Sequence, residues 1–108
     1  MPIAITSYNN CIHDHEALAI QGTKRRILVV DDERDITLTL QLGLEAGGFN
    51  ADAFTNPELA LSGFRPGLYD LVLIDIMMPE MDGFELYEQL KNVDSTVKVC
   101  FLTASEMY

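Results

Sequence analysis

Three aspartates in this chain of 108 residues follow predicted strands at the point where each strand ends. Asp31 and Asp32 come directly after the apolar run 27–30, and Asp75 follows the run 71–74. Ligands of an open parallel sheet bind beyond the carboxyl ends of its strands, so we expect the three carboxylates to converge if the two strands are neighbours. Two carboxylates about 4 Å apart repel by about 4 kcal/mol at an effective dielectric of 20. Such a cluster therefore tends to hold a proton or to bind a cation.

A hard cation would relieve this repulsion best. Magnesium uses few carboxylates, keeps several waters and completes its shell with phosphate oxygens. Zinc would favour Cys or His, and neither lies near these aspartates in the sequence. We therefore predict a Mg²⁺ site that serves phosphoryl chemistry. Each acid also has a simpler interpretation, because Asp32 could only cap a helix and Asp75 could only open a turn.

Apolar runs rich in branched residues alternate with segments of helical length along the chain. The runs cover 27–30, 71–74 and 97–102, and a weaker strand is expected at 50–54. Continuous apolar runs of this length are typical of strands that are covered on both faces of a parallel sheet. Strands that alternate with helices predict an α/β domain with a doubly wound parallel sheet and right-handed crossovers.

Two of the connecting helices carry clear start signals. Asn56 is a suitable N-cap, and Pro57 suits the first helical position. Asp82 and Glu85 have the spacing of a capping box at the start of another helix.

The segment 33–46 carries conflicting signals. Its apolar residues at 36, 38, 40, 42 and 44 alternate with polar or small ones, as in a half-buried strand. Asp32 as an N-cap and the pair Gly47 and Gly48 as a stop favour a helix instead. The length also suits a crossover between parallel strands, so we predict a helix.

Residues 1–24 differ in character from the rest of the chain and are interpreted as a flexible N-terminal extension, which leaves 25–108 as the folded domain. Cys11, His13 and His15 have no second group of ligands at zinc-finger spacing, so no zinc site is expected there. The two cysteines, Cys11 and Cys100, lie in segments of very different character, which favours free thiols over a disulfide.

The chain is strongly acidic, with 17 Asp and Glu against 7 Lys and Arg. This charge should repel nucleic acid and anionic membrane surfaces. No apolar stretch approaches the roughly 18 residues of a membrane span, and the first residues lack the pattern of a secretion signal. We expect a cytoplasmic protein whose folded segment binds neither nucleic acid nor membrane directly.

Three motifs together resemble the receiver domains of two-component response regulators. They are ILVVDDE at 27–33, LIDIMMPEMDG at 73–83 and FLTA at 101–104, and the resemblance covers about residues 25–108. It implies a flavodoxin-like sheet with strand order 2-1-3-4(-5), in which the fifth strand and the last helix are missing from this chain.

The resemblance also implies the roles of the site residues. Asp75 would be the phosphoacceptor, attacking a phosphohistidine of a sensor histidine kinase or phosphotransfer protein, or a small phosphodonor. Mg²⁺ would be held by Asp31, Asp32, Asp75 and the backbone carbonyl of Met77. The chain would not be an enzyme beyond its own phosphorylation and dephosphorylation.

The remaining implied roles concern switching. The hydroxyl of Thr103 would hydrogen-bond a phosphoryl oxygen, and the small Ala104 would leave space beside it. The resulting change of surface would act on a downstream output domain or protein. Pro79 and Gly83 would shape the loop after Asp75, where glycine tolerates backbone dihedral angles that a side chain opposes.

Some features of the family are absent. Its pattern includes a lysine and an aromatic switch residue on a fifth strand, and neither appears before Tyr108. The strand 97–102 would then be an unpaired sheet edge, so we expect a piece of a longer protein.

Two alternative functions stay open at this point. One is a receiver-like interaction module that works without phosphorylation. The other is a Mg²⁺-dependent phosphatase of the haloacid dehalogenase kind, although such enzymes place their two acids two residues apart, whereas Asp31 and Asp32 are adjacent.

Overall fold

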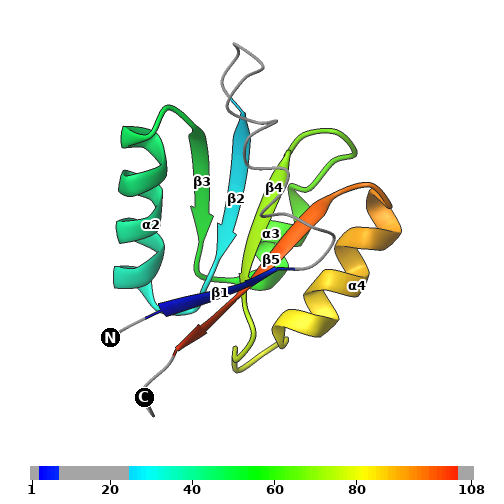
Figure 1. Ribbon diagram of the computed structural model, residues 1–108. Helices are drawn as coiled ribbons and strands as arrows, with labels where there is room; N and C mark the ends of the chain where they lie inside the picture. The colour runs from blue at the N-terminus through cyan, green and yellow to red at the C-terminus, as the bar shows by residue number, and fades with distance from the viewer. Residues whose placement is uncertain (1–2, 8–24, 105–108) are drawn as a thin grey trace.

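The structure is a computed structural model, and it describes residues 3–7 and 25–104. Five strands form one sheet that has helices on both of its faces (Figure 1). In chain order, the elements are β1 (Ile3–Ser7), β2 (Arg26–Val30), α2 (Arg34–Ala46), β3 (Asn50–Phe54), α3 (Pro57–Ser62), β4 (Leu71–Asp75), α4 (Gly83–Val93) and β5 (Lys98–Ala104).

The spatial order of the strands is β1-β5-β4-β2-β3. Strands β2, β3, β4 and β5 are parallel, and β1 runs antiparallel to β5. Counted from Arg26, the parallel strands have the order 2-1-3-4, which confirms the predicted doubly wound, flavodoxin-like sheet. Since β2 and β4 are neighbours with Val30 paired to Ile74, the residues that follow them lie at one sheet edge.

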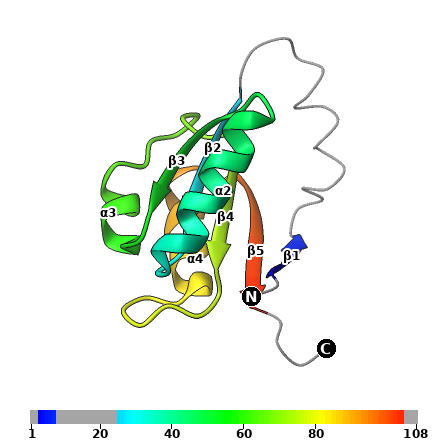
Figure 2. The ribbon, with the colours of Figure 1, turned by 90° about the vertical axis from the view of Figure 1, so that its left-hand side faces the viewer.

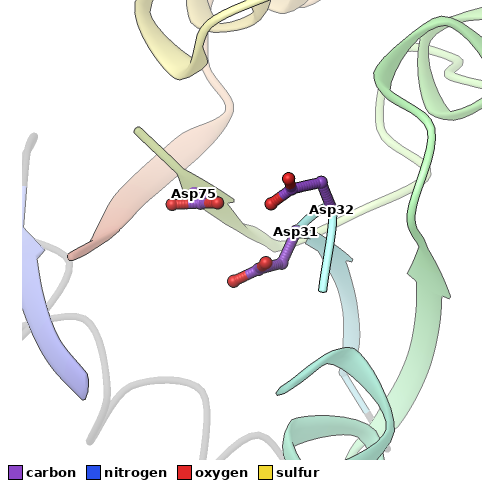
Figure 3. Close-up of side chains that lie close together, drawn as sticks. All are labelled: Asp31, Asp32 and Asp75. Atoms are coloured by element: carbon purple, nitrogen blue, oxygen red, sulfur yellow. The ribbon is translucent and has the colours of Figure 1, made fainter. Parts of the chain in front are cut away.

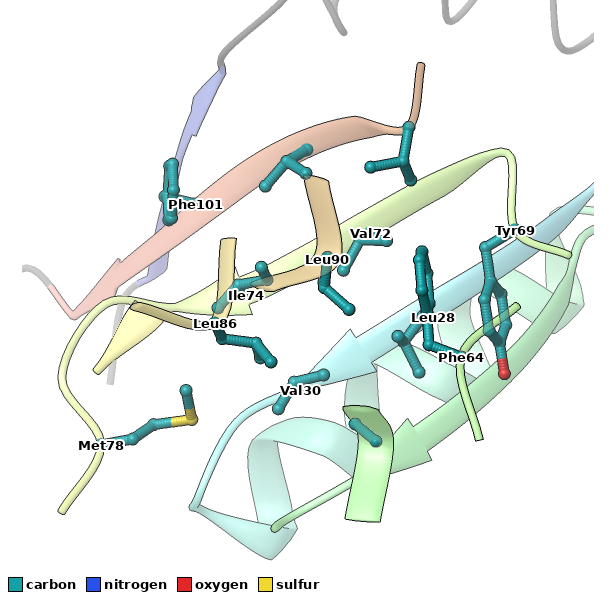
Figure 4. Close-up of a cluster of buried hydrophobic side chains, with 13 residues drawn as sticks. Leu28, Val30, Phe64, Tyr69, Val72, Ile74, Met78, Leu86, Leu90 and Phe101 are labelled. Carbon is teal, nitrogen blue, oxygen red and sulfur yellow. The ribbon is translucent and has the colours of Figure 1, made fainter. Parts of the chain in front are cut away.

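The sheet buries side chains on both faces, which explains the continuous apolar runs. Helix α2 covers one face, and α3 and α4 cover the other (Figure 2). Alternate residues of β2 serve the two sides: Ile27 and Val29 belong to the core on the α2 side, whereas Leu28 and Val30 belong to the larger core on the other side. Members of that larger core include Val72, Ile74, Leu86, Leu90 and Phe101 (Figure 4).

The segment with conflicting signals is helical, as predicted, over Arg34–Ala46. Leu40 and Leu44 pack against the core, whereas Leu38 and Leu42 are 50% and 60% exposed. These two exposed leucines produced the strand-like alternation. The expectation of Asp32 as the N-cap is wrong, because Glu33 holds that position with φ −92° and makes no side-chain cap hydrogen bond.

The other two start signals are confirmed. The Asn56 side chain accepts hydrogen bonds from the amides of Glu58 and Leu59 at 2.8 and 3.3 Å. Asp82 and Glu85 form a reciprocal capping box at the start of α4. Both caps satisfy amides that the first helical turn leaves without a partner.

Strand β1 was not foreseen from the sequence. It pairs antiparallel with β5 over five positions, from Ile3 opposite Ala104 to Ser7 opposite Cys100. The edge of β5 that was expected to be unpaired therefore has a partner strand. Residues 8–24 lie outside the described residues, so the flexible extension, the boundary at residue 24 and the absence of zinc at Cys11, His13 and His15 stay predictions.

Cys100 lies in β5, where it is 4% exposed and disulfide-bonded. The expectation of a free thiol is therefore wrong for this residue, and Cys11 lies outside the described residues. The helices within 25–104 all lack the length or the apolar character needed to cross a bilayer.

Deleting residues 1–7 should promote self-association, because it would leave the amides and carbonyls of the β5 edge open to another chain. Analytical ultracentrifugation over a range of concentrations would measure this. A control that lacks only Pro2, which precedes the strand, should behave like the full chain. A truncated protein that stays as monomeric as the full chain would contradict the expectation.

Candidate functional site

Three carboxylates gather at the carboxyl ends of β2 and β4 (Figure 3). Asp31, Asp32 and Asp75 each offer one oxygen, and these oxygens all lie within 4.8 Å of one another. Other metal-capable groups of three or more acidic, His or Cys side chains are absent from the described residues. The structure thus brings together the three aspartates that the sequence singled out.

The strand register explains why the aspartates meet. Val30 pairs with Ile74, so Asp31 and Asp75 are the next residues on two neighbouring strands. The main chain of Asp31 is also tied to β3, since its amide donates to the carbonyl of Phe54 at 3.1 Å. Asp31 and Asp32 therefore directly follow β2, a strand whose core side chains are fully buried.

The environments of the three aspartates differ. Asp31 is 3% exposed, and its Oδ1 accepts a hydrogen bond from the amide of Glu33 at 2.9 Å. Asp32 is exposed, and Asp75 is half-buried. The Oδ1 of Asp75 accepts a longer bond of 3.2 Å from the amide of Met77. Because Glu33 and not Asp32 begins α2, the Asp32 carboxylate is not used as a helix cap.

Burial and mutual repulsion shift the acidities of this cluster. Burial raises the pKa of Asp31, the amide of Glu33 lowers it, and the charge of Asp32 raises it. Burial first, and then the charge of Asp31, raise the pKa of Asp75 from 3.8 to about 7. Near neutral pH, a proton and a cation therefore compete for this cluster of carboxylates.

Oxygen donors of this kind suit magnesium. Carboxylates are hard ligands, and one exposed and one half-buried aspartate leave room for the waters that Mg²⁺ retains. Among the described residues, the side chains gathered here are all carboxylates. The donor set therefore fits Mg²⁺.

The loop 76–82 connects Asp75 to α4. Met77 lies two residues after the central aspartate and is 79% exposed. Its expected role as a ligand through its backbone carbonyl stays a prediction. A surface hollow of about 430 Å³ lies along the same loop and is lined by Met77, Met78, Pro79 and Asp82.

Thr103 and Ala104 are the last two residues of β5. Leu102 pairs with Asp75, so Thr103 continues the strand beyond the aspartate at the same sheet edge. On the other side of β5, Thr103 pairs with Ala4 and Ala104 pairs with Ile3. The expected contacts of Thr103 and Ala104 with a phosphoryl group stay predictions.

The reason given for Gly83 from the sequence is wrong. Among the described residues, the positive-φ glycines are Gly48 and Gly67, so Gly83 does not adopt a dihedral that only glycine favours. Instead, a Cβ at Gly83 would lie 2.4 Å from the carbonyl oxygen of Asp75. Sequence reasoning could not find this contact, because it depends on where the first turn of α4 lies in space.

Comparison with known proteins identifies the family of this fold and cluster. The family model described as "Response regulator receiver domain" matches residues 27–108. The chain belongs to this family. The resemblance noted in the three motifs is therefore confirmed.

Curated relatives share this region. The transcriptional regulatory protein PcoR of Escherichia coli is 38% identical over 82 residues, which are 76% of this chain and 36% of PcoR. The response regulator receiver protein CpdR of Brucella abortus is 35% identical over 79 residues, which are 73% of this chain and 66% of CpdR. This chain thus spans about a third of the length of PcoR.

Solved receiver structures have the same fold. The response regulator TrrA of Thermotoga maritima, solved in complex with Mg²⁺-BeF, is 40% identical. The similarity covers 69% of this chain and 65% of TrrA, with a TM-score of 0.64. The response regulator StyR is 30% identical with a TM-score of 0.71, over 80% of this chain and 43% of StyR.

Replacing Asp75 with Asn should stabilise the metal-free fold at pH 8 by about 1 to 3 kcal/mol, after allowance for solvent screening. The folded-state pKa of Asp75 is raised to about 7 from 3.8. The stability contributed by the protonated acid is therefore present below about pH 4 and is lost as the pH rises through 7. Urea unfolding followed by circular dichroism, in a buffer with a metal chelator, would measure the difference.

The advantage of Asp75→Asn should accordingly be small near pH 4 and grow toward pH 8. Asp35→Asn is a suitable control, because Asp35 is exposed in the first turn of α2, outside the cluster. It should show no gain over the same range. An Asp75→Asn protein no more stable than the unmodified chain at pH 8 would refute the electrostatic argument.

Proposed function

We propose that this chain is a phosphoacceptor module that takes a phosphoryl group on Asp75 and changes its surface in response. The observation that supports this most directly is the gathering of Asp31, Asp32 and Asp75 within 4.8 Å in a member of the receiver family. The phosphoryl donor would be the phosphohistidine of a sensor histidine kinase or phosphotransfer protein, or a small acyl phosphate.

In the transfer step, an ionised carboxylate oxygen of Asp75 attacks the phosphorus atom. A bond forms between this oxygen and phosphorus, the bond from phosphorus to the imidazole nitrogen breaks, and its electron pair stays on the imidazole. The product is an aspartyl phosphate. Water later attacks the phosphorus, which releases inorganic phosphate and restores the carboxylate.

The other acids of the cluster prepare this step. Asp31, Asp32, Asp75 and the backbone carbonyl of Met77 would hold Mg²⁺. When bound, this ion supplies positive charge that offsets the carboxylates and the phosphoryl oxygens. The amide of Glu33 keeps the buried Asp31 oriented, while Asp32 is exposed and therefore accessible to an ion from solvent.

Thr103 and Ala104 would convert phosphorylation into a change of shape. A phosphoryl group adds about two negative charges and new acceptor oxygens at this sheet edge. The Thr103 hydroxyl would donate a hydrogen bond to one of these oxygens, and Ala104 would leave room for the movement. The following segment would then shift between two arrangements that a downstream domain or protein distinguishes.

The surface beside Asp75 suits the binding of a protein that donates the phosphoryl group. Met77 is 79% exposed next to the acceptor, and an apolar side chain at such a position can pack against a partner during transfer. PcoR and several other relatives are named transcriptional regulatory proteins. Since bacterial transcription takes place in the cytoplasm, we propose this location, with the phosphorylated module acting on an output domain or protein.

The two alternatives differ in support. No observation favours a haloacid dehalogenase-type phosphatase, since the matching family is that of receivers. A receiver-like module that works without phosphorylation would not need three converging carboxylates. It is retained as the outcome that the following experiment would reveal.

Incubation with acetyl phosphate and Mg²⁺ should add the mass of one phosphoryl group to the protein. Intact-protein mass spectrometry after rapid quenching would measure the labelled fraction. Asp75→Asn should stay unlabelled, whereas the control Asp35→Asn should label like the unmodified chain. An unlabelled full chain would favour the phosphorylation-independent module, and a labelled Asp75→Asn protein would place the acceptor elsewhere.

Mg²⁺ should also stabilise the fold without any phosphodonor. An ion that binds only the folded state adds about 2.7 kcal/mol when its concentration is 100 times its Kd. Asp32→Asn should lose most of this gain, because it removes one charged ligand, while Asp35→Asn should keep it. Urea unfolding with and without Mg²⁺ is the measurement, and equal gains in all three proteins would argue against Asp32 as a ligand.

A further inference from the structure

The loop that follows Asp75 is closed by a contact between backbone atoms. The amide of Gly83, the first residue of α4, donates to the carbonyl of Ile76 at 2.9 Å. On the β5 side, the amide of Ile76 donates to the carbonyl of Leu102 at 3.2 Å. Residue 76 is therefore held from both sides, directly after the acceptor aspartate.

Gly83 has no space for a side chain. A Cβ there would lie 2.4 Å from the carbonyl oxygen of Asp75, 2.9 Å from the Cα of Ile76 and 3.1 Å from the carbonyl carbon of Asp75. Ordinary contacts begin at 3.4 Å, so the nearest pair would have to separate by about 1 Å. All three neighbours are backbone atoms, which cannot rotate away as the end of a side chain can.

We propose that Gly83 is a positioning residue for the acceptor site. Because Gly83 has no side chain, the first turn of α4 can pack directly against the backbone of Asp75. This contact determines the position of residues 75–77 relative to Asp31 and Asp32. The inference rests on the proposed function for its consequence in phosphoryl transfer. Its consequence for Mg²⁺ binding can be measured separately.

If a larger residue replaced Gly83, either helix α4 or residues 75–77 would have to move, and the surroundings of Gly83 determine which. The Asp82 and Glu85 capping box fixes the start of α4, and Leu86 and Leu90 are fully buried in the larger core. The helix therefore resists moving outward. On the other side, the buried part of β4 ends at Ile74, and Asp75 is only half-buried. The displacement would fall on residues 75–77 and would lengthen the two hydrogen bonds that hold Ile76.

Such a displacement matters because metal binding and in-line transfer depend on position. A misplacement of about 1 Å can slow a reaction by about 100-fold. The reacting carboxylate of Asp75 and the expected carbonyl ligand of Met77 both belong to the displaced segment. Asp31 and Asp32, which directly follow β2, would stay in place.

The test compares Gly83→Ala with Gly43→Ala in the full chain. Gly43 is an exposed position within α2 whose added Cβ would meet nothing within 4 Å. Three quantities are measured: amide chemical shifts of residues 75–77 in metal-free protein, the Mg²⁺ concentration for half-saturation by NMR titration, and the rate of labelling by acetyl phosphate at saturating Mg²⁺.

Gly83→Ala should fold, shift the amide signals of residues 75–77, raise the half-saturating Mg²⁺ concentration about 10-fold and slow labelling by about 10- to 100-fold. Gly43→Ala should match the unmodified chain in all three. A folded Gly83→Ala protein with unchanged Mg²⁺ half-saturation and labelling rate would overturn the proposal.

The unmodified chain provides a second measurement should Gly83→Ala fail to fold. Mg²⁺ should slow hydrogen exchange of the Gly83 amide several-fold, because the ion would fix the loop that this hydrogen bond closes, while the Gly43 amide should exchange as before. An unchanged Gly83 exchange rate would overturn the proposal. If the full chain binds Mg²⁺ but takes no phosphoryl group, the proposed function fails while the role of Gly83 in ion binding is still decided by the titration.

Discussion

The repulsion among Asp31, Asp32 and Asp75 is the constraint on which the rest of the site depends. Their oxygens lie within 4.8 Å of one another, and burial raises the pKa values of Asp31 and Asp75. The fold supports this unfavourable arrangement with neighbouring strands whose apolar side chains are fully buried. Stability from the core thus offsets a local cost that only a proton or a cation removes.

The strands, the helices and the convergence of the aspartates could be predicted, because each depends on local pattern plus a few topological rules. Buried runs indicated β2, β4 and β5, and the caps at Asn56 and Asp82 were visible in sequence. Segment 33–46 was harder, since exposed Leu38 and Leu42 imitate a strand. For this segment, the number of residues and the glycine pair that follows it predicted the helix correctly, although the hydrophobic period favoured a strand.

Three features could not be predicted, because each depends on residues distant in sequence. The pairing of β1 with β5 joins opposite ends of the described chain, and nothing within residues 3–7 indicates which strand they pair with. The disulfide-bonded state of Cys100 depends on a partner outside its own segment of sequence. The requirement for glycine at position 83 comes from the carbonyl of Asp75 eight residues earlier, across a closed loop. Asp32 was misassigned as a cap because any acid before a helix fits that pattern.

The antiparallel pairing of β1 has a consequence for the order of folding. Ile3 pairs with Ala104, which lies 101 residues further along the sequence. The parallel strands can assemble through short crossovers, but the pair of β1 and β5 requires closure over 101 residues between Ile3 and Ala104. Contacts of such high sequence separation form slowly. Strand β1 would therefore dock late, onto a sheet that is already complete up to β5.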